Sequence, residues 1–391
     1  MKRFFLVALL CVCSAIFIQQ KSAVVAVAAL DTGSITFRDV TQQAGIRFVH
    51  NNGAFGKKFL PETMGPGVAF IDYDNDGRPD IFLVNGMDWP GHVLKHSTPK
   101  LYRNNGNGTF TEKAVVAGIA FSEDGVARAG MGVDASDYDH SGAPSILITN
   151  FSNQMVSLYH NEGKGLFVDE APRSDVGRSS LLTLGFGCFF FDYDLDGWPD
   201  IFIANGHIDR DIERVQPNVK YAMPPHLFRN LGNGTFREVA NSLGKPFNTP
   251  RVGRGAAYAD INNDGRPDLL LSTNGGPAYL FLNEATGPTT INKSLRIKLV
   301  GTKSNRDGIG AVVKLTAGGE TQSQMLRSGS SYLSASELIL TFGLAQYTQA
   351  DTLEIHWPSG QLDKLSNIPA GQTITITESQ GQTASRKFSI H

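Results

Sequence analysis

Residues 187–206, GCFFFDYDLDGWPDIFIANG, decide the fold that we predict for this chain. The stretch contains a short apolar segment, an acidic loop with a central glycine, a second apolar segment and an Asn-Gly pair. Short apolar segments bounded by Gly, Pro, Asn and Asp are typical of β-strands. We therefore expect two strands joined by an acidic loop.

The same unit occurs four times. The other copies are GVAFIDYDNDGRPDIFLVNG at 67–86, GVDASDYDHSGAPSILITNF at 132–151 and GAAYADINNDGRPDLLLSTNG at 255–275. Their loops begin 65, 55 and 68 residues apart, and each of the first three units continues into two more strand-like segments, as in KLYRNNGNGTFTEKA from Lys100. Repeated units of four short strands predict the blades of a β-propeller, because a lone blade cannot bury both faces and stacked neighbours can.

The ends of the repeat leave two arrangements open. The fourth unit stops after Asn283 without an outer strand, whereas SITFRDV at Ser34–Val40 resembles the outer strands of the other units. Either the N-terminal segment closes a ring of four blades, or the ring is incomplete. An incomplete ring would expose two blade faces and would be expected to associate.

The pattern changes from about Asn292 onward. Segments such as LRIKLVG and DTLEIHWPSG read as strands but carry no acidic loops. We predict an all-β protein with an integrin-α-like β-propeller of four visible four-stranded units at 34–287. A small antiparallel β domain at 292–378 and a frayed tail at 379–391 complete the prediction.

The N-terminal 28 residues are expected to be a signal peptide. Lys2 and Arg3 precede an apolar run at Phe4–Ile18, and Lys21 interrupts the run before it reaches the roughly 20 residues of a membrane span. The chain is therefore predicted to be secreted, periplasmic or extracellular, with no stable membrane span after cleavage. Retention of the segment as an anchor is the alternative.

Composition narrows the partners and the means of stabilisation. The formal net charge is −2 and no basic run follows the signal segment, which argues against a nucleic acid partner. Cys188 is the single cysteine outside that segment, so no internal disulfide can form. Bound metal ions are the other common way to stabilise such a protein.

The acidic loops have the residue spacing of a calcium site. In the loop from Asp72, oxygen-bearing side chains stand at positions 1, 3, 5 and 9, and Gly77 at position 6 permits a sharp turn. Several carboxylates within nine residues repel one another unless a cation neutralises them. The alternative for any single copy is an ordinary Asp-Asn-Gly turn. The predicted Ca²⁺ ligands are the side chains of Asp72, Asp74, Asp76, Asp80, Asp192, Asp194, Asp196, Asp200, Asp260, Asn262, Asp264 and Asp268 and the carbonyl groups of Arg78, Trp198 and Arg266.

The second loop departs from this pattern. It keeps Asp137 and Asp139 but has Ser141 and Ser145 where the other loops have carboxylates. We expect it to bind calcium weakly or not at all.

Few residues are candidates for catalysis. Cys188 lies in an apolar segment and is expected to be a buried, inert thiol. Glu62, His207 and Asp209 lie in loops, and no acid/base pair can be assigned among them. Arg306 and Asp307 either form a recognition site or hold a tight turn, and we favour the turn.

The repeated D-x-D-x-D-G-x-x-D unit, with its N-G-x-G-x-F turn, resembles the FG-GAP or VCBS repeats of integrin α-subunit propellers. The tail segments SNRDGIGA from Ser304, GSSYLS from Gly329 and WPSG from Trp357 are similar to the ASPIC/UnbV domain. Their order resembles that of the cartilage acidic protein family. That resemblance implies an extracellular calcium-binding protein with a seven-bladed propeller, whereas only four units are visible here.

Two functions follow as hypotheses. The leading one is a non-enzymatic interaction or adhesion module for a protein or a glycan, because the loops favour calcium and no catalytic group can be assigned. The alternative is an extracellular enzyme or biosynthetic accessory protein acting on a polysaccharide or secondary metabolite. Its site would lie in the propeller channel and use Glu62, His207 or Asp209.

Overall fold

The computed structural model describes residues 38–56, 62, 67–74, 76–89, 91–92, 97–284 and 292–389. The sheets described below all belong to the unit Thr41–His391. The predicted signal peptide and residues 34–37 of the predicted N-terminal outer strand lie outside the described residues. In the described part, no helix has the length and hydropathy needed to cross a membrane.

Within the described residues, one sheet forms at each acidic unit, and we number these sheets blades 1 to 4. Each is an antiparallel meander in which consecutive strands are hydrogen-bonded neighbours, and blade 4 has three strands within the described part of the chain. The strands are, for blade 1, β1 (Val68–Ile71), β2 (Asp80–Leu83), β3 (Lys100–Asn104) and β4 (Phe110–Glu112); for blade 2, β5 (Val133–Ser136), β6 (Ser145–Ile148), β7 (Ser157–Asn161) and β8 (Phe167–Asp169); for blade 3, β9 (Gly185–Phe191), β10 (Asp200–Asn205), β11 (His226–Asn230) and β12 (Phe236–Glu238); and for blade 4, β13 (Gly253–Ala259), β14 (Asp268–Thr273) and β15 (Tyr279–Phe281). The short helices of the loops are η2 (Ala171–Arg173), α2 (Asp175–Ser180), α3 (Ile212–Val215), η3 (Ala240–Ser242) and α4 (Lys245–Asn248).

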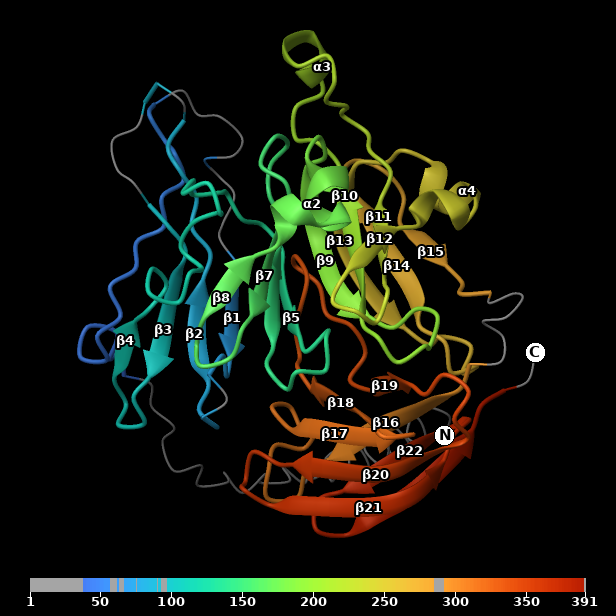
Figure 1. Cartoon of the computed structure of the whole chain (residues 1–391). Helices are drawn as coiled ribbons and strands as arrows, with labels where there is room; N and C mark the ends of the chain where they lie inside the picture. Colours follow the sequence, from blue (N-terminus) through green and yellow to red (C-terminus); the bar gives the residue numbers. More distant parts are fainter. Residues whose placement is uncertain are drawn as a thin grey trace, which may run out of the picture. The chain divides into compact units, whose positions relative to one another are not determined.

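Successive side chains of a strand point to opposite faces of its sheet. Successive residues of each inner strand therefore pack against the two different neighbouring blades. In β9, Cys188 and Phe190 pack toward blade 2, whereas Phe189 and Phe191 pack toward blade 4. The apolar clusters join blade 1 to 2, blade 2 to 3 and blade 3 to 4. Figure 1 shows the blades following one another as a row, with blade 1 at one end and blade 4 at the other.

The row does not close on itself in the described residues, where none of the apolar clusters joins blade 4 to blade 1. Val68 and Phe70 of blade 1 are 62% and 71% exposed, and Leu270 and Leu280 of blade 4 are 48% and 54% exposed. The all-β, propeller-type prediction is confirmed, and the row of blades is open within the described residues. Closure by the N-terminal segment stays a prediction, because most of that segment lies outside them.

Two four-stranded sheets form the C-terminal domain, in the orders β19-β16-β22-β23 and β18-β17-β20-β21. A fully buried apolar core, including Ile297, Phe342 and Leu353, fills the space between them. The strands are β16 (Ser294–Val300), β17 (Val312–Ala317), β18 (Glu320–Met325), β19 (Leu340–Gly343), β20 (Gln349–His356), β21 (Leu362–Pro369), β22 (Gln372–Thr377) and β23 (Gly381–Lys387). The prediction of a small antiparallel domain is confirmed for five of its six strand pairings, and the exception is β16 with β22, which pair in parallel.

The prediction of a frayed tail at 379–391 is wrong. Residues 381–387 form β23, which pairs antiparallel with β22. Beyond the strand, the backbone N–H of Phe388 donates to the carbonyl of Gly371, and the N–H of Ser389 donates to that of Asn263 in blade 4. The tail is therefore an integral edge strand of the domain, although its side chains are mostly exposed.

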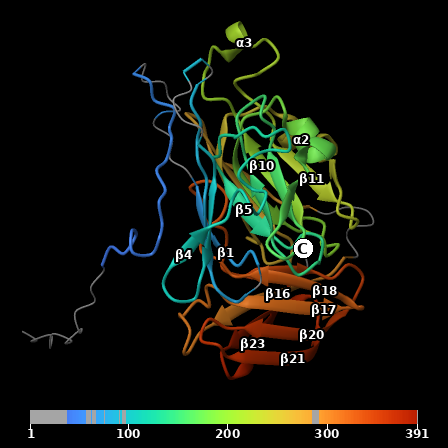
Figure 2. The same ribbon diagram turned by 60° about the vertical axis from the view of Figure 1, so that its left-hand side comes forward.

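Ion pairs and backbone hydrogen bonds hold the C-terminal domain against the blades. Arg327 forms an ion pair with Asp134 of β5 at 2.8 Å, and Arg296 forms one with Asp260 of blade 4 at 3.0 Å. The backbone of Ser331 bridges to that of Val133. In Figures 1 and 2 the C-terminal sheets lie below the row of blades and not at either of its two ends.

Candidate functional site

The acidic loop of blade 3 brings three carboxylates together in a buried position. Oxygen atoms of Asp192, Asp194 and Asp200 all lie within 4.8 Å of one another. Leu195 and Gly197 have positive φ angles of 59° and 95°, and this tight turn directs the carboxylates inward. Asp72, Asp74 and Asp80 of blade 1 form the corresponding group.

The first and last carboxylates of the blade 3 loop already have backbone partners. Asp192 accepts hydrogen bonds from the N–H groups of Asp196 (3.1 Å) and Gly197 (2.8 Å). Asp200 accepts from the N–H groups of Tyr193 (3.1 Å) and Asn230 (2.7 Å). These bonds fix the loop in its folded shape.

The carboxylate at loop position 3 retains one oxygen without a partner. Asp194 Oδ2 forms an ion pair with Arg229 Nε at 2.8 Å, whereas Asp194 Oδ1 is buried and has no hydrogen-bond partner. In blade 1, Arg103 contacts Asp74 Oδ2 at 2.5 Å, and Asp74 Oδ1 is likewise buried and unpartnered. A buried carboxylate oxygen without a partner is energetically costly. Hard oxygen donors are the ligands that Ca²⁺ prefers, so the two groups fit a calcium ion.

Burial raises the pKa values of these carboxyl groups. The pKa of Asp194 is raised to about 6, first by burial and then by the charge of Asp196. Burial also raises the pKa of Asp80 to about 6, and the pKa values of Asp192 and Asp200 lie well above their usual range. A nearby cation would favour the ionised forms instead.

The loop of blade 4 is neutralised differently. Asp260 is paired with Arg296 of the C-terminal domain, and both side chains are almost fully buried. Arg266 pairs with Asp264, and Asn262 Nδ2 donates to Asp264 Oδ2 at 2.9 Å. Asp260 is matched by an almost fully buried arginine, and among the described residues no carboxylate oxygen of this loop is buried without a partner. This loop therefore fits a calcium ion less well than those of blades 1 and 3.

In blade 2 a histidine takes the place of the arginine. His160 Nε2 lies 2.8 Å from Asp139 Oδ2, and this hydrogen bond is the main reason that the pKa of His160 is raised to about 9. Ser145 Oγ accepts the N–H of Asn161 at 3.0 Å, as the last aspartate does in the other loops. The expectation of weak or absent binding here stays a prediction.

The predicted carbonyl ligands belong to residues at position 7 of three acidic loops. The side chain of Arg78 forms an ion pair with Asp76, and this pair does not involve the backbone carbonyl of Arg78. Trp198 stacks on His140, with ring centroids 3.9 Å apart. The carbonyl groups of Arg78, Trp198 and Arg266 remain predicted ligands.

No role in the loops was predicted from the sequence for one position in the third strand of blades 1 to 3. Arg103, His160 and Arg229 occupy one position there and contact loop carboxylates. The recurring dipeptides Arg-Asn, His-Asn and Arg-Asn at the ends of these segments were the available signal.

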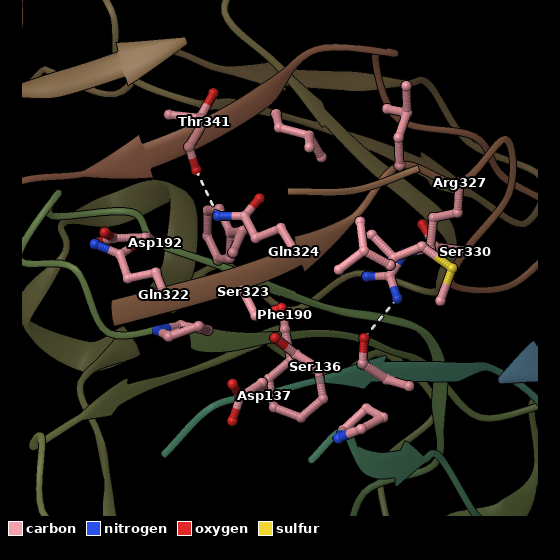
Figure 3. Close-up of a pocket in the computed structure, with 18 of the residues that line it drawn as sticks. Ser136, Asp137, Phe190, Asp192, Gln322, Ser323, Gln324, Arg327, Ser330 and Thr341 are labelled. Atoms are coloured by element: carbon pink, nitrogen blue, oxygen red, sulfur yellow. Dashed lines mark hydrogen bonds between the residues drawn. The ribbon is translucent and has the colours of Figure 1, made fainter. Parts of the chain in front are cut away.

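A cavity of about 190 Å³ lies between the inner strands and β18 of the C-terminal domain. Figure 3 shows its polar lining, which includes Ser136 and Asp137 from blade 2 and Gln324 from β18. Gln324 Nε2 donates to the carbonyl of Thr341 at 2.9 Å, and Arg327 donates to that of Ala135 at 2.5 Å. Both side chains are therefore engaged within the protein.

Among the described residues, no hydrogen bond or ion pair joins all three predicted channel residues. His207 Nδ1 accepts the N–H of Asp209 at 3.0 Å, so these two residues share a local turn. Glu62 is joined to neither of them by any hydrogen bond or ion pair among the described residues. Cys188 is fully buried, and burial raises the pKa of its thiol, which disfavours a reactive thiolate.

A segment of the C-terminal domain lies along the inner strands of the blades. The ring of Tyr332 packs edge-on against Phe186 at 5.1 Å. A Cβ atom at Gly187 would lie 2.9 Å from Ser331 Oγ, so glycine permits the close approach. In the same domain, Arg306 and Asp307 pair at 3.2 Å beside Gly308, whose φ is 70°, and this arrangement favours the turn over a recognition site.

Blades with acidic hairpin loops, followed by a β domain seated on them, define a propeller-type repeat protein. Comparison with protein families matches the FG-GAP-like repeat at residues 72–148, 137–203 and 192–271 and the "ASPIC and UnbV" domain at 301–383. The chain belongs to the family of FG-GAP-like repeat proteins that carry an ASPIC and UnbV domain.

Among curated proteins, the chain is similar to cartilage acidic protein 1 of Homo sapiens, with 24% identity over 353 residues, covering 89% of this chain and 47% of the relative. It is 28% identical over 233 residues to the Xenopus tropicalis protein of that name, covering 56% of this chain and 32% of the relative. The chain thus spans less than half the length of these relatives.

Two solved structures show a distant likeness. One is a lectin of Agrocybe aegerita that recognises non-reducing terminal N-acetylglucosamine, with 16% identity and a TM-score of 0.34 over 78% of this chain and 81% of the lectin. The other is the V. cholerae biofilm matrix protein Bap1, with 10% identity and a TM-score of 0.28 over 82% of this chain and 49% of that protein.

Proposed function

We propose that this chain is an exported calcium-binding repeat protein that acts as an interaction or adhesion module for a protein or a glycan outside the cytoplasm. The observation that supports calcium most is the pair of buried, unpartnered oxygens, Asp74 Oδ1 and Asp194 Oδ1, each within a group of three carboxylates. The proposed ligand groups are therefore those of blades 1 and 3.

Bound calcium would neutralise the carboxylates and stiffen the loop that carries them. In blade 3 this loop also contacts the C-terminal domain. Asn292 Nδ2 donates to the carbonyl of Asp194 at 2.7 Å, and the N–H of Ala345 donates to that of Leu195 at 2.9 Å. Calcium in blade 3 would thus support the surface on which the second domain is seated, which suits a rigid module that presents a binding face.

Calorimetric titration of the calcium-free protein with Ca²⁺ tests the proposal. We expect binding in the wild type, and a smaller number of sites in Asp74→Asn and in Asp194→Asn. Asp139→Asn is the matched control, because its loop lacks two carboxylates, and it should bind as the wild type does. Absence of binding in the wild type, or equal loss in all three variants, would refute the site.

The interaction role has its own test. The calcium-loaded protein is applied to arrays of glycans and of extracellular matrix proteins, with and without a chelator. Calcium-dependent retention on one class of ligand supports the proposal, whereas retention that is indifferent to calcium contradicts a calcium-supported binding face.

A further inference from the structure

The exposed face of blade 1 has the make-up of a blade-to-blade interface. Val68 and Phe70 stand at the positions that Cys188 and Phe190 occupy in blade 3. Cys188 and Phe190 pack against the preceding blade and are 0% and 4% exposed, whereas Val68 and Phe70 are 62% and 71% exposed. In blade 3 this face packs against the preceding blade, whereas in blade 1 the same face is exposed to solvent.

Blade 4 exposes the complementary face. Its Leu270 and Leu280 stand at the positions of Phe202 and Leu227 in blade 3. Phe202 and Leu227 belong to the cluster shared with the following blade and are 0% and 1% exposed, whereas Leu270 and Leu280 are 48% and 54% exposed. The two ends of the row are thus the two different halves of one kind of interface.

One hydrogen bond recurs between neighbouring blades. In blade 1 its donor, and in blade 4 its acceptor, has no such partner among the described residues. An asparagine at the end of the third strand donates to the carbonyl at loop position 2 of the preceding blade. The three instances are Asn161 to Tyr73 (3.0 Å), Asn230 to Tyr138 (2.8 Å) and Asn283 to Tyr193 (2.7 Å).

The equivalent residues at the two ends are Asn104 in blade 1 and Ile261 in blade 4. Asn104 Nδ2 donates to Pro79 of its own blade alone, and the Ile261 carbonyl accepts no hydrogen bond from the described residues. The exposed apolar side chains and the hydrogen-bonding groups without an inter-blade partner therefore indicate the same contact, between the free face of a blade 1 and the free face of a blade 4.

We infer that a second copy of this chain is seated head-to-tail, with its blade 1 on blade 4 of the first. The occupant is a second copy because one chain carries both halves of an interface that it already makes three times internally. Every copy then supplies the complement that the next copy needs. A contact between two different surface patches builds closed rings where the rotation allows and longer assemblies where it does not.

Sedimentation and light scattering of the purified protein test the inference, in saturating calcium and in chelator, so that loss of calcium binding is distinguishable from loss of assembly. We expect the wild type to have at least twice the mass of one chain. Phe70→Asp and Leu270→Asp, both at exposed positions, should each give single chains. Val215→Asp, on a 75% exposed residue of α3, is the matched control and should assemble as the wild type does.

Mixing the two variants gives the sharpest result. A Phe70→Asp chain keeps an intact blade 4 face, and a Leu270→Asp chain keeps an intact blade 1 face. The mixture should therefore form dimers with one interface, while neither variant does so alone. A wild type of single-chain mass at the highest soluble concentration overturns the inference, as does a mixture that stays monomeric when the wild type assembles.

Discussion

Replacing Asp194 by asparagine is expected to change stability in opposite directions with and without calcium. Its oxygens lie within 4.8 Å of those of Asp192 and Asp200. At such a separation two unit charges repel by about 3.5 kcal/mol at an effective dielectric constant of ~20. The opposing ion pair with Arg229, a side chain that is 42% exposed, offsets only about 0–1 kcal/mol. Because burial raises the pKa of Asp194 to about 6, part of the charge is already relieved by protonation at lower pH. We expect a net gain of about 1–2 kcal/mol in the calcium-free protein.

In calcium the same change should be costly. An ion present at 100 times its dissociation constant contributes about 2.7 kcal/mol per site, and the variant loses this contribution at the blade 3 loop. Scanning calorimetry of both proteins in chelator and in calcium measures the difference, since each kcal/mol shifts the midpoint by about 2–4 °C in a folding unit of about 150–250 residues. A midpoint lowered equally in both buffers would refute the reasoning, because Asp194 would then act only as the partner of Arg229.

The pH dependence of the calcium-free protein follows from the same carboxylates. Their pKa values are raised in the folded state, to about 6 for Asp194, so folding retains protons that the unfolded chain releases. The stabilisation is complete below the unfolded pKa of about 4 and is lost as the pH rises through about 6. Thermal midpoints in calcium-free buffer should therefore fall between about pH 4 and pH 6, and saturating calcium should remove this fall. A flat profile without calcium would contradict the assignment.

Three further outcomes are expected. Asn230→Ala should lower the unfolding free energy more than Asn104→Ala, because it leaves the carbonyl groups of two blades unpaired at about 1–3 kcal/mol each, and urea denaturation of both variants measures the contrast. The pKa of His160 is raised to about 9, so its stabilising contribution is present below about pH 6.5 and lost as the pH rises through about 9. His160→Gln should remove that loss from melting curves recorded across this range, and an unchanged profile would contradict it. Deleting residues 380–391 should lower the melting temperature and solubility, because it removes β23 from β22, whereas a frayed tail could be deleted without effect.

The blades were predictable because their signals are local. Each strand pair lies within 20 residues of sequence around an Asp-rich loop, and the sequence of the fourth unit shows no segment for an outer strand. The tail strand β23 was not predictable in this way. Its sequence, GQTASRK, is mostly exposed in the structure, so no alternation of apolar and polar residues marks it as a strand. Pairing with β22 specifies it instead, and that is a contact between segments that local patterns do not record.

The candidate site shows the same division between local and long-range causes. The spacing of oxygen-bearing side chains was readable in the sequence, and it made the first, third and fourth loops look equivalent. What differs between the loops is the cation that reaches each one from elsewhere. Arg229 comes from the third strand of its own blade and leaves Asp194 Oδ1 unpartnered. Arg296 comes from the C-terminal domain and pairs with Asp260, whereas His160 serves a loop that has lost two carboxylates. A repeat can therefore keep its loop and its fold while the charges that balance the loop change from blade to blade. Under the calcium proposal, these charges together with the loop sequence would decide which loops bind an ion.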